Sequence, residues 1–344
     1  MPDSPASKVG ALEPLFGPSE FPSAHRTRAD DRDESIIVAG RRPSRIQIVR
    51  SLRGEVDDWR LGGYAGASDT SRTLLRHWFL GDHVIHGKDG QVFPFSYFFC
   101  QREAIETLIY LYEVRRVHRL SGLIGEFGGP DREREALGVT PEEDDWARYA
   151  FKIATGAGKT KIMSLAIAWS YFHSLYENSD LARDFVVIAP GVTVFERLKE
   201  DFRPEGGGSG VFETDPIIPS GFRADWDVSV VLQDEAAGSA SSGTIFLKNT
   251  HRLYDKSRRK SRDPEVYEWA GPAVRKSTLD KSLALRSRVA SRKRLMVLND
   301  EAHHVWDRGS AWNEAIRFLH DETTRRGGGI VAQLDLTATP RDDK

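Results

Sequence analysis

The chain has 344 residues, of which 39% are hydrophobic and 29% charged, so it has the composition of a soluble globular protein with one large domain or two ordinary ones. Its net charge of −2 excludes a global positive field, so any attraction to nucleic acid must be local. The sequence has no run of 18 apolar residues, no secretory signal and a single cysteine, Cys100. We therefore expect no membrane span, no internal disulfide and a cytoplasmic location.

The first part of the chain is predicted to be helical. Residues 1–44 are rich in Pro, Ser, Arg and Asp and lack periodicity, so we expect them to be disordered or loosely attached. A small helical region is predicted over residues 45–145, and it ends in a Gly-rich, then acidic connector at residues 122–145. Apolar residues at helical spacing predict three helices, the second with Ser71 as a possible cap, over residues 43–60, 71–79 and 97–117.

Short apolar strands alternate with helices from residue 146 to the end of the sequence. Strands are predicted at residues 149–153, 185–189, 228–232, 244–247, 295–298 and 330–336, and helices at residues 159–176 and 193–202. This alternation predicts an α/β fold, with a central, mostly parallel sheet flanked by helices. Functional loops are then expected at the carboxyl ends of the strands.

The first motif is a glycine-rich turn at residues 154–160, between a strand and a helix. Its glycines let the backbone approach anionic oxygens, and the helix dipole favours a phosphate there. Lys159 is predicted to reach the β- and γ-phosphates, and the Thr160 hydroxyl to ligate Mg²⁺. Ile153 replaces a glycine of the general pattern, and the alternative is a turn that binds nothing. The predicted nucleotide-binding residues are Thr155, Gly156, Ala157, Gly158, Lys159 and Thr160.

The second motif, Asp-Glu-Ala-His, begins at Asp300 and follows an apolar strand. Asp300 is predicted to hold Mg²⁺, Glu301 to orient and polarise the attacking water, and His303 to sense the site. Another acidic pair, Asp234-Glu235, also follows a strand, and spacing alone leaves Asp234 open as the magnesium residue. The histidine that completes the four-residue motif, and the Thr-Ala-Thr-Pro sequence that follows one helix and one strand later, favour Asp300.

Taken together, these motifs resemble the first RecA-like lobe of superfamily 2 helicases of the DEAD/DEAH-box type. The greatest similarity is to the motor (Res) subunit of type III restriction enzymes. Asn299 and a second histidine, His304, favour that branch, and the likeness covers roughly residue 97 to the end. Motifs I, Ia, II and III of the family resemble residues 151–160, 187–198, 297–304 and 334–340.

The resemblance implies a RecA-like P-loop NTPase lobe over residues 146–344, with ATP and Mg²⁺ as cofactors. It implies that Gln101 reads the adenine edge, because an amide can both donate and accept; read alone, Gln101 is a helix-start residue. The second lobe, with its arginine finger, and a nuclease core are not found in the sequence, so little turnover is expected from this chain alone. The implied catalytic residues are Lys159, Asp300, Glu301 and His303, and the implied coupling residues are Thr337 and Thr339.

The resemblance also implies contacts to the backbone of double-stranded DNA, without readout of its sequence. Residues 252–294 form an insertion with 14 basic and 5 acidic residues, a net charge of +9. This insertion either adds affinity through counterion release or is a solvated surface loop. A separate modification (methyltransferase) subunit would recognise the DNA site. The candidate DNA contacts are Pro190, Thr193, Arg197 and Asn249.

These observations predict the ATP- and Mg²⁺-dependent DNA translocase motor of a restriction system. Two alternatives stay open at this point. One is a helicase of the same superfamily without a nuclease partner, and the other is a truncated, non-catalytic module that binds ATP or DNA.

Overall fold

The computed structural model describes residues 41, 44, 46–87, 90–130, 145–154, 156–233, 235, 241–249, 288–300 and 311–338. The predictions for residues 1–40, for the acidic part of the connector and for most of the basic insertion lie outside this range. Among the described helices, none has both the length and the apolar character needed to cross a membrane.

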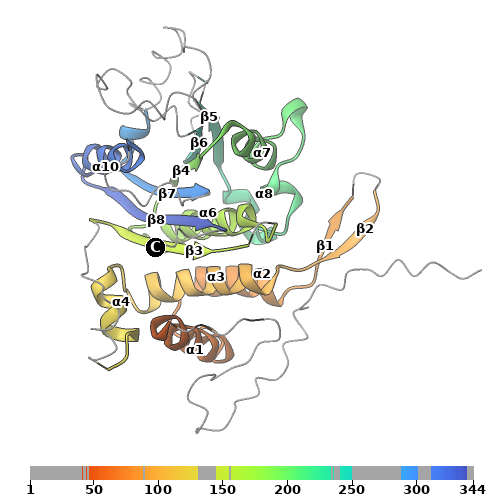
Figure 1. Ribbon diagram of the computed structural model, residues 1–344. Coiled ribbons are helices and arrows are strands. Elements are labelled where there is room, and N and C mark those ends of the chain that lie inside the picture. Colours follow the sequence, from red (N-terminus) through yellow and green to blue (C-terminus); the bar gives the residue numbers. More distant parts are fainter. Residues whose placement is uncertain are drawn as a thin grey trace, which may run out of the picture.

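A sheet of six parallel strands forms the centre of the molecule (Figure 1). The strand order is β3-β8-β7-β4-β6-β5, and each neighbouring pair is parallel. The predicted α/β fold with a parallel sheet and flanking helices is therefore confirmed. The strands are β3 (Ala147–Lys152), β4 (Asp184–Ala189), β5 (Val228–Leu232), β6 (Gly243–Asn249), β7 (Arg294–Asp300) and β8 (Gly329–Thr337).

Helices cover both faces of this sheet. The described helices and short helical turns are α1 (Gln47–Leu61), α2 (Asp69–Leu80), α3 (Phe99–Ile109), η1 (Tyr110–Val114), α4 (Leu120–Phe127), α6 (Lys159–Tyr176), α7 (Val192–Phe202), η2 (Glu205–Gly207), α8 (Val211–Thr214), η3 (Ser220–Asp225) and α10 (Ala311–Thr324). In β4, Phe185 and Val187 pack into the core on the α6 side, whereas Val186 and Ile188 pack with α10 residues such as Ile316. A parallel strand that is buried on both faces has a continuous run of apolar residues, and β4 has such a run.

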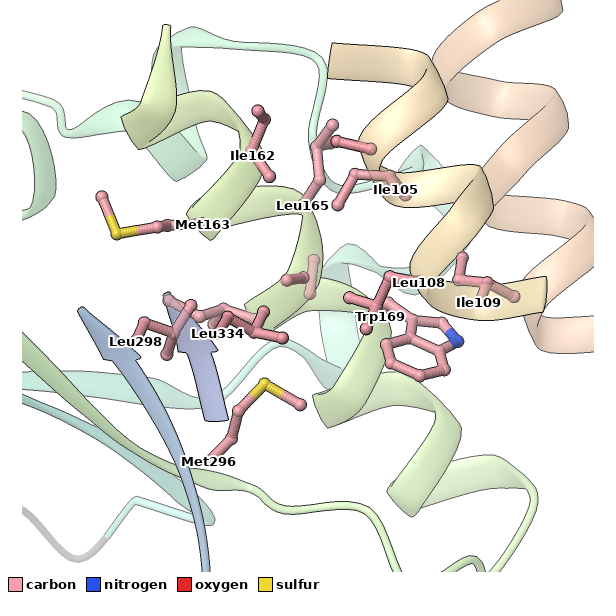
Figure 2. Packing of buried hydrophobic residues seen from close by; sticks show 14 of the residues in the cluster. Ile105, Leu108, Ile109, Ile162, Met163, Leu165, Trp169, Met296, Leu298 and Leu334 are labelled. Carbon is pink, nitrogen blue, oxygen red and sulfur yellow. The ribbon is translucent and has the colours of Figure 1, made fainter. Parts of the chain in front are cut away.

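Helix α6 lies between the sheet and the helices of the N-terminal region. Figure 2 shows Leu165 and Trp169 of α6 next to Ile105 and Leu108 of α3, while Leu298 of β7 lies on the sheet side of α6. Because both sides of the helix are covered, its apolar residues surround it and do not form a single stripe. The helix that begins at the glycine-rich turn is thus held in place from two directions.

The start of α2 differs from the prediction. Ser68 caps the helix, because its side chain accepts a hydrogen bond from the Ser71 backbone N–H at 3.1 Å. The prediction of Ser71 as the cap is therefore wrong. The Ser71 hydroxyl is buried, donates to Glu113 at 2.5 Å and accepts from the Trp169 indole at 2.9 Å. It joins α2 to η1 and α6.

Three further features of this region depart from the predicted elements. The helix predicted over residues 97–117 is α3, which ends in the π-helical turn η1. Helix α4 occupies the first part of the predicted connector, although it contains two glycines. An antiparallel hairpin of β1 (His83–His86) and β2 (Val92–Phe95) was not predicted, and it projects from the helices in Figure 1.

Buried charges fix α1 and the loop after it onto α3. The Glu106 carboxylate is fully buried and accepts hydrogen bonds from Arg60 at 2.7 Å, Tyr64 at 2.6 Å and Arg102 at 2.7 Å. Burial, and then the neighbouring Glu106 charge, raise the pKa of Tyr64. A buried carboxylate is tolerated when cations and donors surround it in this way, so the cluster sets the position of α3 and of Gln101 on it.

Candidate nucleotide and metal site

Three of the sequence motifs meet at one edge of the sheet. Strand β8 lies between β3 and β7, with Lys152 of β3 paired with Thr337 of β8, and Asp300 of β7 paired with Leu336. The N–H of Ile153, where the glycine-rich turn begins, donates to the Thr337 carbonyl at 2.9 Å. The turn, the acidic strand end and Thr337, the first residue of the Thr-Ala-Thr-Pro sequence, are thus neighbours. Thr339 lies outside the described residues.

The glycine-rich turn has the backbone that an anion site needs. Gly156 and Gly158 have φ values of 81° and 77°, in the left-handed region that glycine adopts without strain. Gly158 is the N-cap of α6, and Lys159 and Thr160 form the first turn of that helix. No atom of the described residues would lie within 4 Å of a Cβ added at Gly156, so the described part of the turn is open there. This geometry fits a phosphate group held by amides at a helix start. Thr155 lies outside the described residues.

Asp300 is the acidic group of this edge. Its side chain is fully buried at the end of β7, with Lys159 Nζ at 3.6 Å from Oδ1 and an Arg197 guanidinium nitrogen at 2.7 Å from Oδ2. A buried carboxylate is costly unless cations accompany it, and here two are present. Glu301 and His303 lie outside the described residues.

The donors fit Mg²⁺ bound together with a nucleotide. Within the described part of the chain, no three His, Cys, Asp or Glu side chains gather into a metal cluster. Mg²⁺ does not need one, because it commonly binds through one or two carboxylates, with water and substrate phosphates completing its shell. Asp300 beside the open turn, with Thr160 in the first turn of α6, offers such a set.

A buried polar network that was not predicted from the sequence surrounds Asn299, the residue before Asp300 on β7. Asp335 of β8 accepts hydrogen bonds from Asn299 at 2.6 Å, Arg148 at 2.7 Å and Gln333 at 2.9 Å, and Gln333 accepts from the Trp146 indole at 3.0 Å. The network joins β3, β8 and β7, the strands that carry the motifs. Its one sequence signal is the pair of polar residues at alternate positions within an otherwise apolar strand.

Gln101 touches the glycine-rich turn. Its side-chain amide donates to the Ala157 carbonyl at 3.0 Å, and its oxygen accepts from the Phe98 N–H at 3.0 Å. A Cβ added at Gly158 would lie closer to this amide nitrogen than van der Waals contact allows, so the Gln101 side chain would have to move away from the turn. Gln101 therefore caps α3 and supports the turn. The adenine role stays a prediction.

The four candidate DNA contacts lie along the same edge of the sheet. Thr193 is exposed in the first turn of α7, and Pro190 is half-buried between β4 and α7. Asn249 ends β6 next to β4 and is buried, and its backbone N–H donates to Gln233 at 3.0 Å. Arg197 extends from α7 to Asp300. The structure thus brings all four to the carboxyl edge, but it places one of them on the predicted magnesium residue.

The other acidic pair has different surroundings. Asp234 lies outside the described residues, and Glu235 follows β5, the edge strand farthest from β3. Glu235 accepts from the Leu232 N–H at 3.1 Å and from Arg203 at 2.7 Å. Burial acts to raise the pKa of Glu235, but the hydrogen bonds from Arg203 and Leu232 outweigh it and lower that pKa. Four strands separate β5 from β3, so the end of β5 lies far from the glycine-rich turn that follows β3.

In a comparison with protein families, residues 95–342 match the family described as type III restriction enzyme, res subunit. The match extends from the end of β2 beyond β8, so it includes α3, the whole sheet and each described residue of the candidate site. The comparison with curated proteins finds no match.

Proposed function

Because the chain belongs to the type III restriction enzyme res subunit family, a family of helicase-like motors, we propose that its first RecA-like lobe binds ATP with Mg²⁺. The observation that carries this proposal is the approach of two motifs that are distant in sequence. Lys159 follows the open turn, and its ammonium lies 3.6 Å from the buried Asp300 carboxylate. A triphosphate seated on the turn would bring its charge between these two groups.

Each residue of the site then has a physical role. The amides of the turn and the start of α6 hold the phosphate oxygens, and Lys159 neutralises the β- and γ-phosphates. Thr160 and Asp300 orient the metal, and Glu301 positions the attacking water, with His303 beside it to sense the site. Mg²⁺, when bound, withdraws charge from the phosphates and so favours loss of the terminal one. Gln101 holds the turn and faces the base.

We further propose that the motor acts on the backbone of double-stranded DNA. The supporting observation is that the loop before α7 and the end of β6 lie on the edge that also carries the nucleotide site. Exposed Thr193 and the helix start offer donors to phosphates, which position a duplex without reading its sequence. Pro190 and Asn249 shape this edge, while Thr337 and Thr339 couple it to hydrolysis. A modification subunit would supply site recognition, in the cytoplasm.

Titration of the protein with a fluorescent, non-hydrolysable ATP analogue in Mg²⁺ tests the nucleotide site. We expect Lys159→Ala to weaken binding by at least about tenfold, because the lost contact is a charge-assisted hydrogen bond to phosphate. Lys199→Ala is the matched control, because Lys199 lies on α7 and pairs with Glu205 and Glu196 at the surface. Equal affinities for wild type and Lys159→Ala would refute the proposed site.

A further inference from the structure

The position of Arg197 differs from what its sequence context predicts. It was predicted to contact DNA, yet its guanidinium donates a 2.7 Å hydrogen bond to Asp300 Oδ2. The contact arises from the sheet order, because β4, which leads into α7, pairs directly with β7. One residue thus connects the edge proposed for DNA with the carboxylate proposed for the metal.

We propose that Arg197 is a positioning residue that stands in for Mg²⁺ at Asp300 until the Mg²⁺–nucleotide complex displaces it. The inference rests on the proposed function. It adds a competition between a side chain of this protein and the metal for the same carboxylate. It also predicts where the Arg197 guanidinium goes when Mg²⁺ replaces it, namely from Asp300 toward the edge proposed for DNA.

The two cations at Asp300 differ in their freedom to leave. The Lys159 side chain is 6% exposed and fixed at the start of α6, whereas the Arg197 side chain is 53% exposed. A half-exposed guanidinium can turn into solvent at little cost, because water replaces the hydrogen bond that it loses. Mg²⁺ binds carboxylate oxygens at about 2.0–2.1 Å and requires near-octahedral access to them. Arg197 is therefore the group that must move.

Displacement would place the charge where it can contact DNA. Arg197 lies one helical turn after Thr193 on α7, and both side chains are exposed. Once free of Asp300, the guanidinium can pair with a backbone phosphate. Binding of the Mg²⁺–nucleotide complex and binding of DNA would then favour each other to the same extent, since linkage between two ligands is reciprocal.

The test measures how much Mg²⁺ improves nucleotide affinity. A fluorescent, non-hydrolysable ATP analogue is titrated into the protein in EDTA and in saturating Mg²⁺. The dissociation constant in EDTA is divided by the dissociation constant in Mg²⁺, and this ratio is compared between variants. In Arg197→Gln we expect this ratio to rise by about tenfold, because Mg²⁺ no longer displaces an ion pair and the metal-free nucleotide loses a nearby cation. Arg197→Lys, which keeps the charge, should give a ratio close to that of wild type.

Arg203→Gln is the matched control, because Arg203 follows the same helix and pairs with Glu235 at the far edge of the sheet. It should leave the ratio unchanged. An equal rise in Arg203→Gln, or no rise in folded Arg197→Gln, would overturn the inference while the proposed function stands. Wild-type protein that binds no nucleotide in either buffer would refute the proposed function and this inference with it. Circular dichroism establishes that each variant is folded.

Binding of a labelled DNA duplex, with and without the Mg²⁺–analogue complex, tests whether the displaced Arg197 couples nucleotide binding to DNA binding. In wild type and Arg203→Gln, the complex should increase DNA affinity, and in Arg197→Gln this increase should disappear. If the complex increased the DNA affinity of Arg197→Gln as much as that of wild type, Arg197 would not carry the coupling, and the proposed contact of Arg197 with DNA would be overturned.

Discussion

Two strands of the same sheet end in an acidic pair, and the described member of each pair, Asp300 or Glu235, has different surroundings. At the end of β7, Asp300 is fully buried between Lys159 and Arg197. At the end of β5, the Glu235 side chain is 35% exposed and accepts from its own turn and from Arg203. The local sequence is similar, but the positions in the sheet differ. A single strand, β8, separates β7 from β3, which leads into the glycine-rich turn, whereas four strands separate β5 from β3. The chemistry of an acidic strand end is thus set by its neighbours across the sheet.

The largest expected effect comes from Asp300→Asn. The Mg²⁺-dependent gain in affinity for the ATP analogue should fall by about 100-fold or more, because loss of a metal ligand costs at least as much as loss of the groups that orient it. Titrations in EDTA and in Mg²⁺ measure this gain. A variant that retains the wild-type gain would place the metal elsewhere, with the β5 end as the alternative.

The second prediction concerns the buried network around Asp335, which joins β8 to β3 and β7. Asp335→Asn should lower the free energy of unfolding by about 3 kcal/mol, because it leaves the Arg148 guanidinium without its buried anionic partner. Urea denaturation followed by fluorescence measures the change. No network of this kind is present around the described residues at the end of β5. If Asp335→Asn lowered the free energy of unfolding no more than Glu235→Gln does, the two regions would tolerate the loss of a carboxylate charge equally well.

The third prediction separates two reasons for glycine in the turn. Alanine at Gly156 or at Gly158 should cost roughly 1–2 kcal/mol of stability through its left-handed backbone. At Gly158 the added carbon also displaces the Gln101 amide from Ala157, whereas at Gly156 it meets no described atom within 4 Å. Gly158→Ala should therefore be the less stable variant in urea denaturation. Equal losses would show that Gln101 does not support the turn.

Most of the fold could be predicted from the sequence, because its signals are local. Apolar runs such as residues 185–189 identify strands that are buried on both faces, and the helix predicted at residues 159–176 has the bounds of α6. The hairpin β1–β2 was missed, although Gly87 and Gly90 lie between its two strands and punctuate turns. The side chains of β1 are alternately half-buried and exposed, as expected for a strand with one covered face.

The candidate site could be predicted only in part, because its geometry depends on strand order. Composition and spacing did not exclude Asp234 as the magnesium residue, and only the strand order shows how far the ends of β5 and β7 lie from the glycine-rich turn. Arg197 and Asp300 are 103 residues apart, and Arg148 and Asp335 are 187 apart. No periodicity within one element carries information about such pairs. The packing of separate elements creates them.

The smallest expected effect comes from Glu235→Gln. A half-exposed ion pair contributes about 0.2–1 kcal/mol, so the free energy of unfolding at pH 7 should fall by no more than that. The pKa of Glu235 is lowered below its ordinary value of 4.5, so its contribution is present above that pH and is lost as the pH falls through the lower, folded value. The wild-type and variant urea midpoints should therefore converge as the pH is lowered from 7 toward 3.

Glu235→Gln should also leave the Mg²⁺-dependent gain in nucleotide affinity at the wild-type value, since β6, β4, β7 and β8 separate β5 from the strand before the glycine-rich turn. Together with Asp300→Asn, it forms a matched pair in which one carboxylate at a strand end loses its charge. If Glu235→Gln abolished the gain and Asp300→Asn did not, the roles of the two strand ends would be reversed, and the distance across the sheet would not decide which acid holds the metal.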